Sequence, residues 1–210
     1  MHLAIVGTGA VGTALGIRLS KHHRIAFGSR DPQSEAARQL DLALGTKADV
    51  RLTPDAVAEA SVVILATPWP VTEAIVKDLD LAGKIVVDCT NDVGPDFLPE
   101  SSPVPSCAER LAAWLPESRV VKAFSTAGAG TMADPNYGAG ACGVRPMMPF
   151  CGDDAEAKRV VRGLIEEVGF EPVDAGDLVA ARTLEPLALL WIRLAHGGYG
   201  SNIAFALLTR

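Results

Sequence analysis

Short apolar runs alternate with longer amphipathic stretches over the first 90 residues of the chain. The apolar runs have the length of strands and lie at residues 3–6, 24–27, 61–66 and 84–88. The stretches between them are predicted to be helices, at residues 10–20, 33–44, 53–60 and 71–79. Strands without polar alternation are typical of a parallel sheet that is covered on both faces. The repeated order of strand and helix therefore predicts an α/β fold with a doubly wound parallel sheet.

The second half of the chain is less regular. Residues 92–105 hold several prolines, and residues 125–149 are rich in Gly, Ala and Pro, so both are predicted to be irregular. An irregular stretch as long as the second is more often functional than a plain connection. The remaining pattern predicts helices at residues 107–115, 153–168 and 180–195, strands at 119–124 and 170–174, and a helical turn after the glycines of 196–200. Pro186 is expected to divide the last long helix into two pieces.

Three glycines with the spacing Gly-x-Gly-x-x-Gly follow the first strand and open the first helix. In that context the motif indicates a dinucleotide site. The first glycine permits the tight turn, the second lets the backbone approach a pyrophosphate, and the third lets the helix pack closely on the strand. Free amides and the helix dipole then face the anion. The predicted contacts are Gly7, Thr8, Gly9, Ala10, Val11 and Gly12. The alternative is a turn that merely favours glycine.

The end of the second strand indicates which dinucleotide is bound. An NAD site usually has an acidic residue there, which holds the ribose hydroxyls, whereas this chain has Gly28, Ser29 and Arg30. A 2′-phosphate is then not repelled, Ser29 can donate a hydrogen bond, and Arg30 can pair with the phosphate or stack on the adenine. Asp31 follows directly and weakens this argument, and the pair could be only a solvated turn. The pattern favours NADP(H), and the fold class becomes a Rossmann NADP-binding fold with a small C-terminal α/β extension.

Composition narrows the class of protein further. The chain has 210 residues, of which 49% are hydrophobic, so it can bury a substantial core. No apolar run reaches the roughly 18–20 residues of a membrane span. The first two residues lead straight into a strand without the features of a signal peptide, so we expect a cytoplasmic protein with no membrane partner. The net charge of −6 and the lack of a basic block argue against a nucleic-acid partner.

Six motifs, in the same order and spread over nearly the whole chain, resemble the NADPH-dependent reductases of coenzyme F420, a deazaflavin. They lie at residues 7–12, 28–30, 66–69, 121–124, 150–154 and 174–176. The last four read Ala-Thr-Pro-Trp, Val-Lys-Ala-Phe, Phe-Cys-Gly-Asp-Asp and Asp-Ala-Gly. A similar nucleotide domain occurs in the cytosolic part of six-transmembrane metalloreductases, for which the resemblance covers only the nucleotide half. The first resemblance implies an oxidoreductase that exchanges a hydride between NADP(H) and coenzyme F420 or a related flavin.

The same resemblance implies which residues line the nicotinamide end of NADP(H). They are Thr67, Pro68, Trp69, Thr90, Asn91, Ser125, Thr126 and Ala127, with Gly128 adjoining them. All of these follow predicted parallel strands, and ligands of doubly wound sheets bind at the carboxyl ends of strands. The chain departs from the family pattern in three places. The next basic residue after Arg30 is Arg38, Asp92 stands where relatives commonly have proline, and residues 138–149 match no family motif.

The implied chemistry needs neither a nucleophile nor a metal ion, because the cofactors carry it and the protein holds their rings face to face. The sequence has no serine elbow, no clustered His and Cys and no paired carboxylates, and we name no catalytic residue and no metal ligand. Lys122 lies within an apolar strand and is interpreted as structural, since the chain lacks the large helical domain of hydroxyacid dehydrogenases. The four cysteines are interpreted as reduced residues without a disulfide.

Two other functions stay open at this point. One is an NADP-dependent reductase of a small carbonyl or imine, and the other is a non-catalytic NADP-sensing binding protein. The Gly- and Ala-rich residues 125–143 could leave room over the nicotinamide, which a sensor would not need. This feature weighs against the sensor.

Two domains are predicted: a dinucleotide-binding Rossmann domain, residues 1–145, and a small C-terminal domain, residues 146–210, that closes the cofactor cleft. The predicted helix over 180–195 is apolar on more than the one face that the sheet can bury. Its remaining face, with Leu187, Leu190 and Trp191, predicts contact with a second subunit. We therefore expect a homodimer whose reaction partner is a small redox compound.

Overall fold

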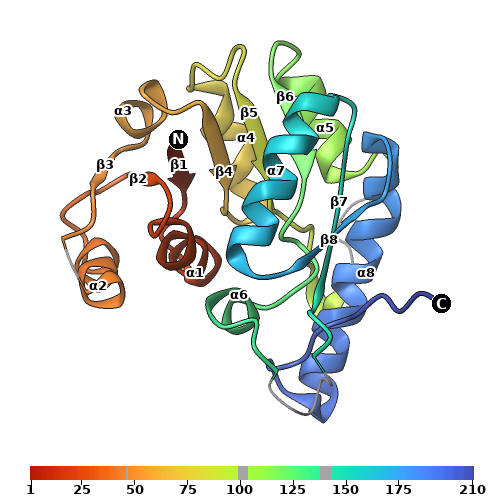
Figure 1. Ribbon diagram of the computed structural model, residues 1–210. Helices are drawn as coiled ribbons and strands as arrows, with labels where there is room; N and C mark the ends of the chain where they lie inside the picture. Colours follow the sequence, from red (N-terminus) through yellow and green to blue (C-terminus); the bar gives the residue numbers. More distant parts are fainter. Residues whose placement is uncertain (46, 99–103, 138–142) are drawn as a thin grey trace.

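Eight strands form one sheet through the middle of the molecule (Figure 1). This computed structural model describes residues 1–45, 47–98, 104–137 and 143–210. The strands are β1 (His2–Val6), β2 (Arg24–Ser29), β3 (Val50–Leu52), β4 (Val62–Leu65), β5 (Ile85–Asp88), β6 (Arg119–Lys122), β7 (Met147–Gly152) and β8 (Glu171–Asp174). Their order is β3-β2-β1-β4-β5-β6-β7-β8, and β1 to β6 run parallel. The predicted doubly wound sheet is confirmed, and its order reverses between β1 and β4, where such sheets bind ligands.

β7 and β8 extend the sheet beyond β6. β7 runs antiparallel to β6, and β8 runs parallel to β7. Helix α7 (Ala155–Val168) joins these two strands, and α8 (Ala181–Leu194) follows them. The C-terminal extension is therefore an α/β unit whose strands belong to the same sheet. The division into domains at residues 145 and 146 stays a prediction.

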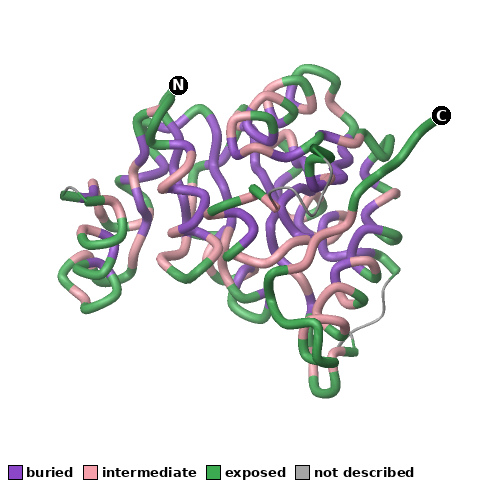
Figure 2. Tube along the Cα trace, turned by 60° about the horizontal axis from the view of Figure 1, so that its bottom comes forward, coloured by how far each residue is buried: buried purple, intermediate pink, exposed green. Residues whose placement is uncertain are grey.

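Helices cover both faces of the sheet. One face carries α1 (Ala10–Leu19), α2 (Glu35–Leu44), α6 (Ala129–Ala133) and α7, and the other carries α3 (Thr53–Ala58), α4 (Trp69–Lys77), α5 (Cys107–Trp114) and α8. In β4, Val62 and Ile64 pack against the first layer, whereas Val63 and Leu65 pack against the second. The whole strand is thus buried, as Figure 2 shows for the centre of the sheet. This two-sided burial explains why the strands read as unbroken apolar runs.

Three short elements differ from their sequence prediction. β3 is not predicted at all, and α6 and the first half of β7 lie in the stretch predicted to be irregular. Each is too short, or too rich in small residues and proline, to show a clear period.

Helix α4 begins at Trp69, two residues earlier than predicted, with Pro70 in its first turn. A proline there removes no helical hydrogen bond, so it fits without a kink.

The end of the chain corrects two predictions. Helix α8 is continuous through Pro186, so the predicted division of this helix is wrong. Pro186 is exposed while Leu184 and Ala188 are buried, and their packing outweighs the one backbone hydrogen bond that the proline ring removes. The prediction of a helical turn after the glycines is also wrong. The glycines themselves form a π-helical turn, Ala195–Tyr199, and residues 201–210 continue without helix or strand.

A capping box at the start of α5 also ties this helix to α8. The Ser106 hydroxyl accepts a hydrogen bond from Glu109 N at 3.2 Å, and the Glu109 carboxylate accepts one from Ser106 N at 2.8 Å. Arg182 of α8 donates two more hydrogen bonds to that carboxylate, at 2.9 and 2.7 Å. Chiefly through these bonds from Arg182, the pKa of Glu109 is lowered to about 2.

We expect Glu109→Gln to remove a stabilisation that is present at neutral pH and lost in acid. Because the folded-state pKa lies below the ordinary value of 4.5, the carboxylate stabilises the fold above that value and loses its effect as the pH falls toward 2. The variant's free energy of unfolding should be lower by about 1–2 kcal/mol at neutral pH. Urea unfolding at several pH values measures this difference, which should shrink below pH 4.5.

A matched control for this variant is Glu156→Gln. It breaks the exposed pair between Glu156 and Arg159 on α7, which solvent screens, so its loss should change the free energy of unfolding less than the loss of Glu109 does. A deficit in Glu109→Gln that stays constant into acid would mean that the charge of Glu109 does not stabilise the fold.

Candidate dinucleotide-binding site

The turn after β1 can be built only with glycine at two of its positions. Gly7 has a φ of 113°, and a Cβ atom there would lie 2.4 Å from the carbonyl oxygen of Ala66. A Cβ atom at Gly12 would lie 2.1 Å from the carbonyl oxygen of Gly7. Both distances are far below van der Waals contact, so the loop and the start of α1 could not pack this closely with any side chain.

Gly9 differs from these two glycines because the space around it is open. Apart from its two chain neighbours, no residue has an atom within 4 Å of the position that its Cβ would take, and its φ of −77° is available to any residue. Gly9 is also the N-cap of α1, where no side chain caps the helix and no acidic residue lies in the first turn. The amides of Ala10, Val11 and Gly12 belong to that turn and have no helical acceptor. The loop therefore presents uncapped amides beside open space, which is the arrangement that binds an anion.

The five turns at the carboxyl ends of β1, β2, β4, β5 and β6 are joined by backbone hydrogen bonds. Gly7 N donates to Gly28 O at 3.3 Å, Ala66 N donates to Val6 O at 2.9 Å, and Cys89 N donates to Leu65 O at 3.1 Å. Ala123 N donates to Asp88 O at 3.1 Å in the same way. The predicted site segments are thus brought together along one edge of the sheet.

The turn after β2 places Ser29 and Arg30 differently. The Ser29 hydroxyl donates to Asp31 O at 2.9 Å and accepts from Asp31 N at 3.1 Å, so it is engaged in its own turn. Arg30 is exposed, and within the described part of the chain its side chain has no hydrogen bond or ion pair. Gly28 has a packing role that the sequence did not suggest, because a Cβ atom there would lie 3.1 Å from Thr53 at the start of α3. Arg30 is therefore the group in this turn that is available to a phosphate.

The turn after β4 is held by its own side chains. The hydroxyls of Thr67 and Thr72 lie 2.9 Å apart, and Thr72 donates to Pro68 O at 3.0 Å. Trp69 is only 8% exposed, and its ring stacks on Trp114 with a centroid distance of 5.2 Å. The ring of Trp69 thus packs inside the helical layer and leaves little surface for a ligand.

The turns after β5 and β6 contain two buried polar atoms without a partner. Asn91 Nδ2 donates to Ser125 O at 2.9 Å, which ties the two turns together. The side-chain oxygens Asn91 Oδ1 and Ser125 Oγ are buried and have no hydrogen-bond partner. Phe124, just before Ser125, is buried with a φ of 56°, a strained conformation that is common where a chain is redirected at a functional site. An acceptor and a hydroxyl on two turns joined by a hydrogen bond are groups that could pair with the amide of a ligand.

The stretch that follows is covered by the C-terminal part of the chain. Thr126 Oγ1 donates to Met148 Sδ at 3.7 Å, and Ala127 packs against the core. A Cβ atom at Gly128 would lie 2.5 Å from the ring of Trp191, so the indole of α8 fits only over a glycine. Trp191 Nε1 in turn donates to Ile203 O at 2.8 Å. No local signal in the sequence relates Gly128 to Trp191.

A buried lysine lies beside these turns. Lys122 Nζ donates to Asp88 Oδ2 at 2.9 Å and to the carbonyl oxygen of Thr90, and it lies 3.2 Å from Glu185 Oε1. Although burial works in the opposite direction, the two carboxylates raise the pKa of Lys122 above its ordinary value. The lysine is therefore a fixed cation inside the protein. Sequence reasoning identified Lys122 as structural and missed both of its acidic partners.

Metal and thiol chemistry find no support in the described residues. No group of three or more His, Cys, Asp or Glu side chains among these residues could hold a metal ion. Separately, no helix in the described part of the chain is long and apolar enough to cross a bilayer. Cys89, Cys107 and Cys151 are free and buried, and burial raises the pKa of Cys107 and Cys151 to about 12. These thiols stay protonated at neutral pH and are poor nucleophiles. Cys142 lies outside the described residues.

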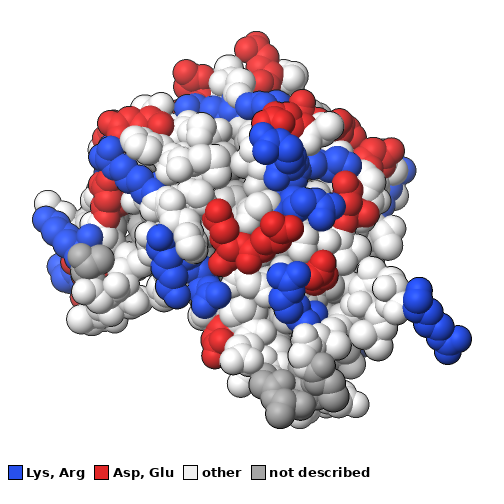
Figure 3. Space-filling model, viewed as in Figure 1, with Lys and Arg blue, Asp and Glu red and all other residues white. Residues whose placement is uncertain are grey.

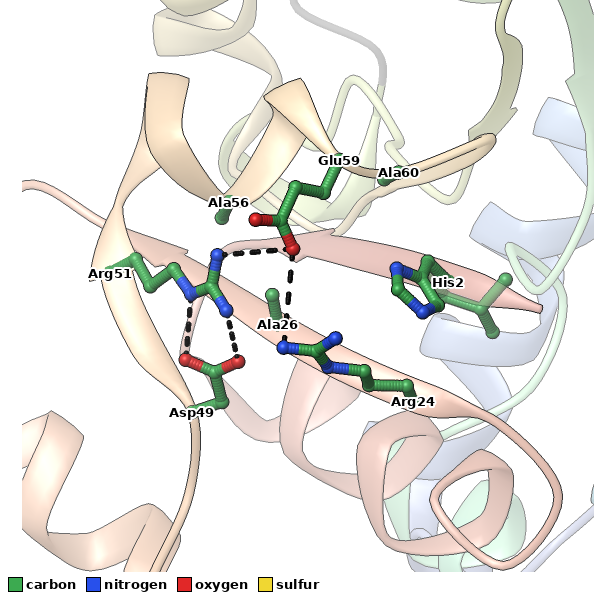
Figure 4. Close-up of a pocket in the computed structure, with 9 residues that line it drawn as sticks. His2, Arg24, Ala26, Asp49, Arg51, Ala56, Glu59 and Ala60 are labelled. Carbon is green, nitrogen blue, oxygen red and sulfur yellow. Dashed lines mark hydrogen bonds and ion pairs between the residues drawn. The ribbon is translucent and has the colours of Figure 1, made fainter.

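The pocket in Figure 4 lies at the opposite edge of the sheet, at the amino ends of β1 and β2. Its charged groups pair with one another: Arg51 lies 2.7 Å from Asp49 and 3.5 Å from Glu59, and Arg24 lies 4.0 Å from Glu59. The pocket volume of about 10 Å³ has room for about one water molecule. It cannot hold a dinucleotide.

On the face of the molecule shown in Figure 3, basic and acidic side chains are interspersed.

Known proteins share both the sequence and the fold. The family of coenzyme F420-dependent NADP oxidoreductases matches residues 2–92. The F420-dependent NADP reductase of Methanocaldococcus jannaschii is 33% identical over 210 aligned positions, which cover 92% of each chain. A crystal structure from Arthrobacter sp. FB24, provisionally named an F420-dependent NADP reductase, has a TM-score of 0.88, 30% identity and full coverage of both chains.

A second group of relatives is longer than this chain. Metalloreductase STEAP3 of Rattus norvegicus is 33% identical over 193 positions, which cover 90% of this chain and 37% of that protein. The likeness extends over nearly all of this chain but over little more than a third of the metalloreductase, as expected for a comparison that is limited to a part of that protein. The reductase from Methanocaldococcus, by contrast, matches from end to end. This chain belongs to the family of coenzyme F420-dependent NADP oxidoreductases.

Proposed function

We propose that this protein is an NADP-dependent oxidoreductase that transfers a hydride between NADP(H) and coenzyme F420 or a related flavin. The observation that carries the proposal is the pair of unpartnered buried atoms, Asn91 Oδ1 and Ser125 Oγ, on turns joined to an uncapped glycine loop. Buried polar atoms without partners are rare, and each calls for a ligand or a water molecule. The relative from Methanocaldococcus is an F420-dependent NADP reductase, which supports the same activity here.

The residues of the site divide by the part of NADP(H) that each would hold. The proposed contacts are Gly7, Thr8, Gly9, Ala10, Val11 and Gly12 for the pyrophosphate, Ser29 and Arg30 for the 2′-phosphate, and Thr67, Pro68, Trp69, Thr90, Asn91, Ser125, Thr126 and Ala127 for the nicotinamide end. Ser29 would donate to the phosphate only after its hydroxyl turns away from Asp31 O. Asn91 Oδ1 would accept from the carboxamide and Ser125 Oγ would donate to it. Trp69 contributes through the backbone of its turn, because its ring is buried against Trp114.

The chemistry itself needs little from the side chains. Bound NADP(H) would supply the hydride chemistry, by exchange with the deazaflavin. The protein's part is to orient the two rings and to keep water away from them. A site without nucleophile or metal ligand is sufficient for this task, and the buried, protonated thiols fit that view.

An anaerobic absorbance assay tests the proposed function. The purified protein, NADPH and coenzyme F420 should together bleach the deazaflavin band, and Asn91→Ala should slow the reaction. Parallel reactions contain flavin mononucleotide, or a small ketone with an amine. Turnover only with the ketone and amine would make the protein a carbonyl or imine reductase. Tight NADPH binding without any turnover would make it a sensor, and either result would overturn the proposal.

We further propose that residues 1–145 bind the dinucleotide and that residues 146–210 close over its nicotinamide end. The packing of Trp191 over Gly128 supports the closing role of residues 146–210, because it places a C-terminal side chain over the turn after β6. Limited proteolysis is a test: saturating NADPH should slow cleavage within residues 195–210. Equal cleavage rates with and without NADPH would argue against a closing role.

We also propose a homodimer formed through the exposed face of α8. Leu190 is 48% exposed, and Leu207 and Leu208 of the C-terminal segment are also exposed. Light scattering at micromolar concentration should give roughly twice the chain mass of 21.9 kDa, and Leu190→Glu should give a single chain. A monomer in the unsubstituted protein would remove this proposal.

A cytoplasmic location, without nucleic-acid or membrane partners, is proposed on two grounds. The net charge is −6, and Cys89, Cys107 and Cys151 are free thiols, as is usual in a reducing compartment. Cell fractionation tests the location. Recovery with membranes or with nucleic acid would contradict it.

A further inference from the structure

The buried charges around Lys122 form a closed network. The ammonium of Lys122 has three donors, and it faces three acceptors: Asp88, Glu185 and the carbonyl of Thr90. Lys122 and Asp88 are 0% exposed, and Glu185 is 9% exposed. The ammonium and the Asp88 carboxylate are therefore fully shielded from bulk solvent, and Glu185 nearly so.

The two carboxylates have further partners of their own. Asp88 Oδ1 accepts from Thr90 N at 2.9 Å and from Thr90 Oγ1 at 2.6 Å. Glu185 accepts from the backbone amides of Cys107 and Ala108, at 3.0 and 3.2 Å. These amides are the first of α5, whose helix dipole offsets the extra negative charge. Every charged group in the network is thus paired.

The network fixes one residue above all. The amide, the hydroxyl and the carbonyl oxygen of Thr90 are all held by Asp88 and Lys122. The next residue, Asn91, binds Ser125 O through its amide group and leaves Oδ1 without a partner. The orientation of the Asn91 side chain therefore depends on the hydrogen bonds that fix the backbone and side chain of Thr90.

Stability alone does not explain this arrangement. Replacing a buried ion cluster with apolar residues of similar volume is often neutral or stabilising, because desolvation offsets the attraction between the charges. A buried network of this kind is better suited to fixing a geometry. The geometry that it fixes here is the turn beside the two unpartnered polar atoms.

We propose that Lys122 is a positioning residue for the nicotinamide end of NADP(H), which it serves by locking the Thr90–Asn91 turn. Glu185 lies in α8, so this helix also supports the site, through the buried contact between Glu185 and Lys122. The inference rests on the proposed function, since it takes NADP(H) as the ligand. Lys122 itself touches no ligand, because it is buried and its donors are occupied.

The test compares two ligands on the full-length variant Lys122→Met. NADPH carries the nicotinamide, whereas 2′,5′-ADP carries only the adenine end and its 2′-phosphate. We expect the affinity for NADPH to fall by about tenfold or more and that for 2′,5′-ADP to change by less than about twofold. Isothermal titration calorimetry of both ligands measures the ratio of the two affinities. A residue with a merely structural role would lower the melting temperature without changing that ratio.

Lys84→Met is the matched control. Lys84 also lies beside a strand of this sheet, but at the opposite edge, where it donates to Ala58 O at 3.3 Å and to Ala60 O at 2.7 Å. Its loss should destabilise the fold and leave the ratio of affinities unchanged. If Lys122→Met does not fold, adding Asp88→Asn removes one of the two carboxylates left without the ammonium and keeps an oxygen for Thr90. The other carboxylate, Glu185, keeps its two backbone amide donors at the start of α5. The ratio should still fall in that double variant.

The outcomes separate the two proposals. A normal ratio in a folded Lys122 variant overturns the positioning role and leaves the proposed function intact. Failure of the unsubstituted protein to bind NADPH overturns the proposed function and this inference with it. A reduced ratio in the Lys122 variant together with an unchanged ratio in the Lys84 variant supports the inference.

Discussion

Gly9→Ala is expected to weaken NADPH binding by about 10- to 100-fold while the protein stays folded. Gly9 has open space around it and a φ of −77°, so alanine fits the free protein without strain. The added methyl group would stand where a pyrophosphate must approach the amides of α1, and charge-assisted hydrogen bonds there would lengthen or be lost. The only cost to folding is a poorer N-cap, about 1 kcal/mol. Calorimetric titration with NADPH and thermal unfolding measure the two effects separately.

Gly163→Ala is the control for this prediction. Gly163 lies inside α7, again with no atom within 4 Å of its Cβ position. Alanine there should raise stability by roughly 0.5–1 kcal/mol and leave NADPH binding unchanged. If Gly9→Ala binds NADPH as tightly as the unsubstituted protein does, the glycine loop does not hold the pyrophosphate.

Arg30→Ala should reduce the affinity for NADPH by about 10- to 30-fold and change that for NADH by less than about twofold. Arg30 is exposed and has no partner in the described part of the chain, so its removal should not disturb the fold. A guanidinium forms paired hydrogen bonds with a phosphate, and NADH lacks the 2′-phosphate. The preference for NADPH over NADH should therefore largely disappear. Equilibrium titrations with both nucleotides at one salt concentration measure it.

Arg38→Ala makes the same change in net charge eight residues later in the chain, in the first turn of α2. Arg38 is already paired with Glu35 at 3.0 Å and donates to Gln33 O at 3.1 Å. We expect less than a twofold effect on either nucleotide, because the pair has to break before Arg38 can reach a phosphate. A loss of NADPH affinity in the Arg38 variant and not in the Arg30 variant would show that the 2′-phosphate is held elsewhere.

The nucleotide half could be predicted because its signals are local. β1, the glycine loop and α1 lie within 19 residues, and the clash that requires Gly12 arises inside the loop, with the carbonyl oxygen of Gly7. Gly7 is required locally by its φ of 113°, whereas its clash with the carbonyl oxygen of Ala66 is a long-range contact. The two-sided burial of the strands appears directly as apolar runs. The helix cap at Asp154 and the end of α7 at Gly169 were also predicted, since capping depends on a few adjacent residues.

The contacts that complete the candidate site depend on distant parts of the chain. Lys122 is 34 positions from Asp88, and Glu185 is 78 positions from Cys107. No periodicity relates such residues, so the buried network could not be predicted. Gly28 shows the same limit. Its position indicated that a 2′-phosphate would not be repelled, whereas its packing against Thr53 becomes evident only when β2 and α3 are placed together.

The most direct test of the central claim is to follow the hydride itself. NADPH that carries deuterium at the reactive carbon of its nicotinamide is mixed with coenzyme F420 and the protein under anaerobic conditions. The account predicts that one stereoisomer of the labelled NADPH delivers deuterium to the reduced deazaflavin, because both rings are held in one site. Reduction with the label lost to solvent, or no reduction of the deazaflavin at all, would contradict direct hydride transfer between the two cofactors.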